Sequence, residues 1–113
     1  MKPWFQLSRS PATLSRPACP HRRLGRLLAR ELPHGLTLGA SSLRPWASAN
    51  FIGARHIFPC VAEGGDSETL CRSLHARIAD ADWKLAGHIV ADVAIEPAGA
   101  AGSLRIEILT VED

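Results

Sequence analysis

The sequence lacks the features that mark several specialised classes of protein. It has three cysteines, an odd number without paired spacing, which argues against a disulfide framework and favours free thiols in a reducing compartment. No apolar run approaches the length of a membrane span, and the N-terminus has no apolar core of a secretory signal. These absences predict a cytoplasmic protein with no membrane span.

Compact motifs for metals and phosphates are also missing. The chain has no close CxxC or HxxxH pair, and the glycines of 99–103 do not stand between a strand and a helix, as a phosphate-binding loop requires. Cys71 and His75 would be neighbours on a helix, but a zinc site needs two further ligands. We therefore expect no metal, no cofactor and no catalytic residue, with Cys71 as a small core residue.

The charge is divided unevenly along the chain. Residues 1–46 contain eight basic residues and one acidic residue, a balance of +7, whereas residues 47–113 contain five basic and ten acidic residues, a balance of −5. Six of the eight prolines also lie at or before Pro45. This composition predicts a basic, disordered extension over 1–46, rich in Arg, Ser and Pro, and a folded domain over 47–113.

One stretch of the extension has the pattern of a helix. Residues 21–33 put four leucines on one helical stripe, with arginines on the flanks and back. Three interpretations stay open: an organellar transit peptide, a basic arm that binds nucleic acid or an anionic membrane surface, and an extension without function. The extension has aromatic residues only at Trp4, Phe5 and Trp46, so it offers no interleaved stacking platform for single-stranded nucleic acid.

Residues 47–113 have the pattern strand, helix, strand, strand. Residues 47–63 are rich in β-formers but contain a glycine and a proline, which favours an edge strand. Apolar residues at helical spacing follow Asp66, which suits the N-cap position. Alternating apolar residues then predict strands over 88–96 and 104–111.

The pairing of the last two strands follows from their charges. The register that places Glu96 opposite Arg105 avoids a like-charge pair, and it also places Val90 opposite Val111. If the third predicted strand lies in the middle of the sheet, the other two lie at its edges. These are the first strand, with its glycine and proline, and the second strand, with its charged side chains. The predicted fold is a small α+β domain: a three-stranded antiparallel sheet in the order 1-3-2 with one helix on one face, half of a ferredoxin-like unit in shape.

Three residues of the types used in catalysis, His88, Asp92 and Glu96, share one row of the second predicted strand. Residues i and i+4 of a strand are about 13 Å apart at about 3.3 Å per residue, so the row cannot form one site. It is expected on the solvent face of an edge strand. Arg55 and His56 follow a glycine that marks a bulge, and together with His88 they are the candidates for binding a small ligand.

The leading prediction is a small, non-enzymatic module that acts through self-association or a protein partner. A domain of 67 residues without a disulfide or a metal has a core of marginal size, so a homodimer is expected. The sheet face that one helix leaves uncovered would supply the interface, through Val90, Ala94, Leu109 and Val111. The alternatives are a ligand-binding or catalytic domain that uses Arg55, His56 and His88 at a dimer cleft and, more weakly, nucleic-acid binding through the basic arm.

Overall fold

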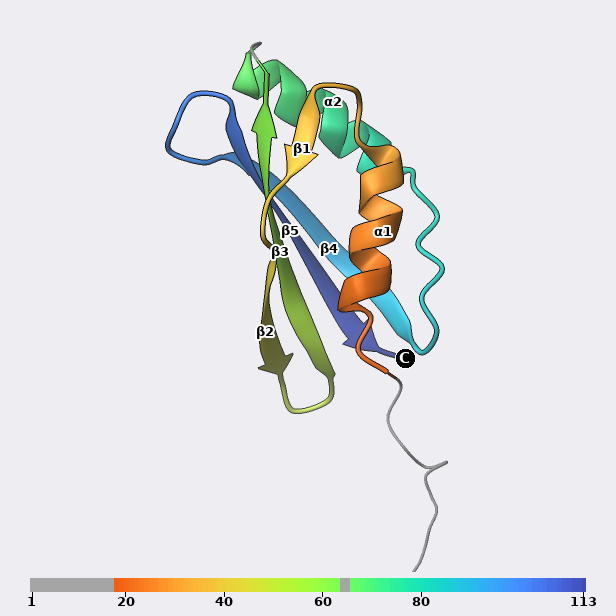
Figure 1. Ribbon diagram of the computed structural model, residues 1–113. Helices are drawn as coiled ribbons and strands as arrows, with labels where there is room; N and C mark the ends of the chain where they lie inside the picture. The colour runs from red at the N-terminus through yellow and green to blue at the C-terminus, as the bar shows by residue number, and fades with distance from the viewer. Residues whose placement is uncertain (1–17, 64–65) are drawn as a thin grey trace, which may run out of the picture.

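Two helices and five strands make up the described part of the chain, which in this computed structural model covers residues 18–63 and 66–113. In chain order they are α1 (His21–Glu31), β1 (Leu36–Leu38), β2 (Ser42–Ala47), β3 (Ile52–Ala62), α2 (Ser67–Ala79), β4 (His88–Pro97) and β5 (Ser103–Glu112), as Figure 1 shows. The protein is a small α+β domain, as predicted, but it has more elements than expected.

All five strands belong to one antiparallel sheet. β3, β5 and β4 lie in that order, which is the order predicted for the three expected strands. β1 and β2 both pair with the remaining edge of β3, β1 with residues 60–62 and β2 with residues 52–57. The predicted three-stranded sheet is therefore wrong, because the segment before β3 adds two short strands.

The predicted edge position of β3 is also wrong. The contacts of its proline and its glycine explain why an inner strand contains them. Pro59 lies between the segments that pair with β1 and β2, where no strand residue requires a donor from it. Its carbonyl accepts a hydrogen bond of 2.7 Å from the N–H of Gly39. Gly53 lies so close to β5 that a Cβ would overlap the carbonyl oxygen of Thr110. Both residues thus permit close contacts inside the sheet.

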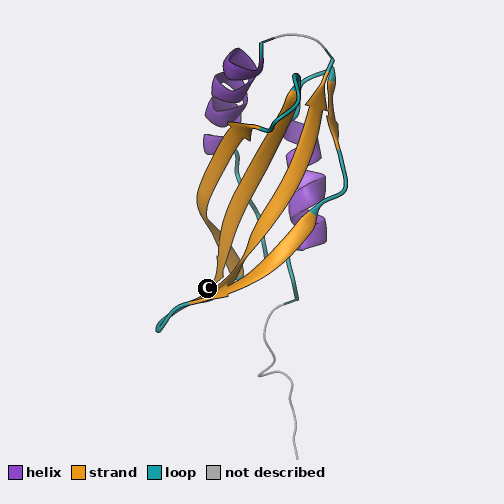
Figure 2. Cartoon of the chain, turned by 90° about the vertical axis from the view of Figure 1, so that its left-hand side faces the viewer, coloured by secondary structure: helices purple, strands orange, loops and turns teal. Residues whose placement is uncertain are grey.

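Both helices lie behind the same face of the sheet in Figure 2, and the opposite face is open. The inner sides of β3 and β5 pack against the helices, and Leu24 and Leu28 of α1 are completely buried in this layer. The expected single helix is therefore wrong. The expected disorder of 1–46 is wrong for 21–46, which forms α1, β1 and most of β2. Residues 1–17 of the predicted extension lie outside the described residues.

The core is formed by the apolar sides of all the larger elements. The helix α2 begins as predicted, because Asp66 Oδ1 accepts a hydrogen bond of 3.1 Å from the N–H of Glu68. Its apolar stripe then faces the sheet. The most deeply buried apolar side chains are Leu24, Leu28, Phe58, Cys60, Leu74, Ile78, Leu104, Ile106 and Ile108.

The hairpin of β4 and β5 keeps the predicted register over part of its length. Glu96 is opposite Arg105, as predicted. A bulge in β4 then shifts the first three residues of this strand by one place. Val90 is consequently opposite Thr110, so the predicted pair of Val90 and Val111 does not form.

The bulge also reverses the face to which the beginning of β4 points. A shift of one residue moves every side chain before it to the other side of the sheet. His88 therefore points toward the helices and is only 8% exposed, whereas Asp92 and Glu96 remain exposed on the open face. The prediction of a solvent-exposed row is wrong for His88 and correct for the other two residues.

Candidate functional site

The open face of the sheet is the first candidate site, and its side chains follow from strand alternation. Thr110 and Ile108 of β5 are buried against the helices, so Leu109 and Val111 point to the open face. The register extends this face across the neighbouring strands. Its larger side chains are Arg44 and Trp46 of β2, Arg55, Ile57 and Val61 of β3, Ile89, Asp92 and Glu96 of β4, and Arg105, Glu107, Leu109 and Val111 of β5.

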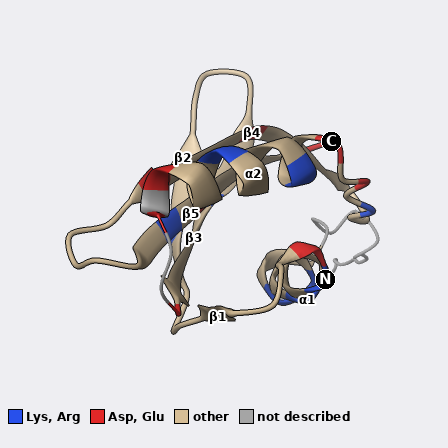
Figure 3. Ribbon diagram, turned by 90° about the horizontal axis from the view of Figure 1, so that it is seen from above, with Lys and Arg blue, Asp and Glu red and all other residues tan. Residues whose placement is uncertain are grey.

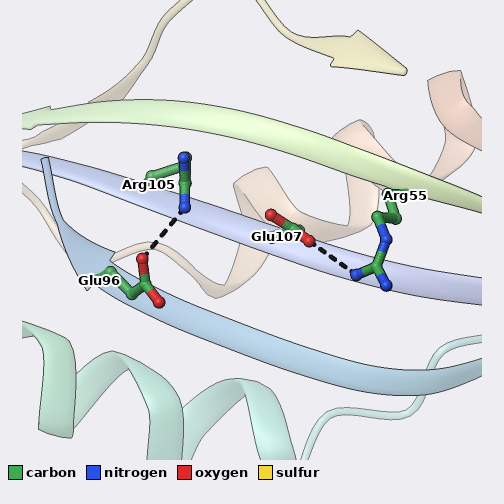
Figure 4. Close-up of polar contacts among 4 residues, drawn as sticks. All are labelled: Arg55, Glu96, Arg105 and Glu107. Atoms are coloured by element: carbon green, nitrogen blue, oxygen red, sulfur yellow. Dashed lines mark hydrogen bonds and ion pairs between the residues drawn. The ribbon is translucent and has the colours of Figure 1, made fainter. Parts of the chain in front are cut away.

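Two ion pairs tie the strands together on this face, as Figure 4 shows. Arg55 Nη1 on β3 lies 2.9 Å from Glu107 Oε2 on β5, and Arg105 Nη2 on β5 lies 3.1 Å from Glu96 Oε1 on β4. All four side chains are partly exposed, so each pair contributes at most about 1 kcal/mol. Their larger effect is that the charges of these central side chains cancel.

Three of the four predicted interface residues lie on the open face. Ala94 is exposed, Leu109 is half-buried, and Val111 is only 7% exposed beside its neighbours. Val90 instead packs against the core, because the bulge turns it toward the helices. Ile89, which the alternation predicted for the buried row, takes a position on the open face and is 50% exposed.

A chain of hydrogen bonds on the other face links α1 to the sheet. His56 Nε2 lies 2.8 Å from Thr110 Oγ1, and His56 Nδ1 lies 2.8 Å from His21 Nδ1. His21 Nε2 then lies 2.8 Å from Ser41 Oγ. A neutral imidazole has one donor and one acceptor, so each ring must donate at one nitrogen and accept at the other. The whole chain of bonds is therefore polarised in one direction.

Burial keeps these rings neutral. Burial, followed by the charges of His21 and His88, lowers the pKa of His56 to about 4. Burial also lowers the pKa of His21. The His21 ring stacks on Phe58, with ring centroids 5.3 Å apart. With both nitrogens of His56 bonded inside the protein, this network has the pattern of a satisfied buried group that fixes α1 on β3.

A pocket of about 360 Å³ lies at the end of the sheet beside this network. Leu43, Pro45 and Ala54 supply its apolar walls, and His88, Thr110 and Glu112 supply polar groups. His88 Nδ1 donates to the carbonyl of Ala86 at 3.2 Å, which fixes the orientation of the ring. The pocket has room for a small molecule with an apolar body.

The structure does not bring the predicted ligand-binding residues into one site. His56 and His88 both point toward the helix side of the sheet. Arg55 points to the open face and pairs with Glu107, because successive residues of a strand point to opposite sides. A site that contains all three side chains is therefore excluded within one chain.

Two of the three cysteines, Cys60 and Cys71, have surroundings that oppose formation of a reactive thiolate. Cys60 is buried in the core, and burial raises the pKa of its thiol to about 11. Burial also raises the pKa of Cys71, and the charges of Glu68 and Glu96 add to this effect. Among the described residues, no three His, Cys, Asp or Glu side chains are arranged to hold a metal ion. Neither described helix combines the length and apolar character needed to cross a membrane.

Sequence reasoning missed the outward position of Ile89 and the partnership of His21 with His56. The bulge that turns Ile89 outward falls in a regular alternation, which gives no signal of an inserted residue. The contact of His21 with His56 joins positions 35 residues apart and depends on how α1 docks. The leucine stripe of residues 21–33 was the signal that this helix has a buried side.

The chain matches no known family model, and neither a characterised protein nor a solved structure is significantly similar to it.

Proposed function

We propose that this protein is a small, non-enzymatic module that self-associates through the open face of its sheet. The observation that carries the proposal is the position of both helices on one face. The opposite face keeps partly exposed apolar side chains at its centre and rim, including Ile57, Leu109 and Ile89. Burying such a surface against a partner is favourable by roughly 25 cal/mol per Å² of apolar area.

The charge of this face favours a second copy as the partner. It carries three arginines and three acidic residues, so that it has no net charge: Arg44, Arg55, Arg105, Asp92, Glu96 and Glu107. In a two-fold contact a surface meets itself, and a surface of one sign would repel its copy. A neutral surface with both signs interspersed can exchange ion-pair partners across the axis.

The size of the core no longer supports this proposal. The folded domain includes α1, β1 and β2, so it is larger than the 67 residues on which the expectation of a marginal core rested. The proposed homodimer therefore rests on the sheet face that both helices leave uncovered and on the composition of that face. Cross-strand pairing at the free edge of β4 is a poor alternative, because the bulge and the charged Asp92 and Glu96 disfavour it.

Gel filtration with light scattering of the full chain tests the proposal. Wild-type protein should have the mass of a dimer at micromolar concentration, and Ile89→Glu should convert it to a monomer, because the new carboxylate lies inside the contact. Ile52→Glu is the matched control, since Ile52 is 45% exposed, similar to Ile89, but points to the other side of the sheet. A folded wild-type monomer, or an equal effect of both variants, would contradict the proposal.

The pocket at the end of the sheet supports a second candidate function, the binding of a small ligand. Its apolar walls and the fixed ring of His88 suit a molecule with an apolar body and one hydrogen-bonding end. Indole and benzyl alcohol are suitable probes, because Glu112 also lines the pocket and would repel an anion. A rise in melting temperature that Ala54→Leu abolishes would support this function, and the absence of any rise with either probe would count against it.

A further inference from the structure

The outer side of α1 is the most cationic helical surface of the described chain. Leu24 and Leu28 face the core, and four exposed arginines occupy the remaining surface: Arg22, Arg23, Arg26 and Arg30. Figure 3 shows this concentration of basic residues along α1. Arg22, Arg26 and Arg30 are four residues apart, so they form one row along the helix with steps of about 6 Å.

The arginine row forms no ion pair within the described residues, and the one acidic residue of α1, Glu31, stands at the far end of the helix. Arg22, Arg26 and Arg30 make no ion pair there, and Arg23 donates only to the carbonyl of Lys84, at 2.7 Å. The positive charges of the row also repel each other along the helix. Arg22 and the neighbouring Arg23 lie in the first turn, where the helix dipole disfavours cations.

Other features of α1 oppose helix stability in the same place. Its N-cap residue, Pro20, makes no capping hydrogen bond through its side chain, and the first turn contains no acidic residue. Gly25 stands in the middle of the helix, although an added Cβ would meet only Phe58 Cε1 at an ordinary 3.5 Å. Local choices that conflict with the fold are typical of functional sites. An anionic ligand would offset the part of this conflict that comes from charge, which is the repulsion between the arginines and the lack of an acidic residue in the first turn.

A groove runs beside the arginine row, between α1 and the edge of the sheet. It has a volume of about 350 Å³, and its rim includes Arg22, Arg26 and the hydroxyl of Ser41. Two glycines line the groove and have no side chains to fill it. Gly25 belongs to α1, and Gly39 lies between the end of β1 and the beginning of β2. The half-buried His21 ring stands at the same wall. A flat ring can enter such a groove while its phosphate faces the guanidinium groups.

We propose that α1 and this groove bind single-stranded nucleic acid. The arginine row would pair with successive phosphates of one strand, because three charges in line fit a polymer of phosphates better than one small anion. One unpaired base would lie over the glycines, against the His21 ring and the guanidinium plane of Arg26, which supply the stacking surface that the few Trp and Phe residues of the segment 1–46 do not. This site lies apart from the open sheet face, so it is independent of self-association.

A membrane surface is the weaker ligand for the same charges. A helix that binds in the membrane interface inserts an apolar face between the lipids. The apolar side of α1 is already used, because Leu24 and Leu28 are completely buried against the sheet. Duplex nucleic acid is also less suitable, since its bases are turned inward and leave the groove empty.

Fluorescence anisotropy of a short labelled oligo-uridine with the full chain tests this proposal. Binding should weaken with salt, with a slope of log K against log salt near −2, the value expected from three neutralised phosphates at about 0.7 each. The double variant Arg22→Gln/Arg26→Gln should lose about tenfold or more in affinity at low salt. A matched control, Arg72→Gln/Arg77→Gln, removes two exposed arginines from α2 and should retain affinity within about twofold.

Comparison of ligands completes the test. The single strand should bind more tightly than a duplex of the same length, and vesicles containing anionic lipid should bind more weakly than either. Thermal melting of each variant verifies that it is folded. Failure of wild-type protein to bind the oligonucleotide, equal losses in the two double variants, or preference for the duplex or the vesicles would overturn the proposal.

Discussion

His56 Nε2 lies 2.8 Å from the hydroxyl oxygen of Thr110, and both residues are completely buried between the sheet and α1. His21 occupies the other nitrogen of this ring, so both ring nitrogens are bonded inside the protein, and a proton added to the ring would place a positive charge in a buried site. A polar contact at this depth makes the attachment of α1 dependent on protonation.

Acid should therefore destabilise the protein. The pKa of His56 falls from 6.5 in the unfolded chain to about 4 in the fold, so the unfolded state binds the proton more readily. This difference in pKa contributes a total on the order of 3 kcal/mol to the free energy of unfolding. The full contribution is present above pH 6.5 and is lost as the pH falls toward 4. Urea unfolding at pH 7 and at acid pH measures it.

The exposed His75 supplies a control for this prediction. His56→Gln should flatten the pH dependence of the free energy of unfolding, whereas His75→Gln should leave it unchanged. An acid dependence that survives His56→Gln in full would assign the effect to other groups.

The hydroxyl of Thr110 should matter more than its methyl group. Thr110→Val keeps the shape of the side chain but leaves a buried nitrogen of His56 without its partner, at a cost of about 1–3 kcal/mol. Thr110→Ser keeps the hydrogen bond and should cost less. Chemical denaturation of the two variants decides the matter, and a smaller loss for valine than for serine would show that packing dominates.

The segment before residue 47 should be essential for folding. Leu24→Ala and Leu28→Ala each remove a completely buried side chain and should cost about 2–5 kcal/mol. Leu27→Ala, at a half-buried position on the same helix, should cost less. A truncated chain that begins at Ala47 lacks α1 and β1 and should fail to fold cooperatively, as circular dichroism during heating would reveal. Cooperative unfolding of that chain at the wild-type temperature would contradict this.

Two glycines should respond to alanine in opposite directions. Gly25→Ala adds a methyl group at ordinary contact distance and removes backbone freedom, so it should stabilise the fold by about 0.5–1 kcal/mol. Gly53→Ala forces β3 away from the backbone of Thr110 and should destabilise it by about 1–3 kcal/mol or more. Melting temperatures of the two variants give the signs, and equal signs would count against the close approach at Gly53.

The sequence predicted the elements whose patterns are local. The capping residue Asp66, the helix after it and the pairing of Glu96 with Arg105 all follow from residues close together in the chain or from one hairpin. These short-range features are determined by periodicity and charge, which the sequence displays directly.

The errors concern features that depend on distant contacts. The basic composition of 1–46 outweighed the leucine stripe of α1, although burial of Leu24 and Leu28 stabilises the helix despite its charges. Pro59 favours an edge strand when only the sequence is considered, because the gap between β1 and β2 that accommodates it is a tertiary feature. The bulge in β4 placed His88 and Val90 on the helix side without any mark in the alternation.

Isotope-filtered nuclear Overhauser spectroscopy on a mixture of labelled and unlabelled chains tests self-association through the open face most directly. A dimer formed through this face should show contacts between chains that involve the methyl groups of Ile57, Ile89, Leu109 and Val111, and it should lose them in Ile89→Glu. Contacts between chains that instead involve α1 or only the edge of β4, or no contacts at concentrations where light scattering also reports a monomer, would contradict it.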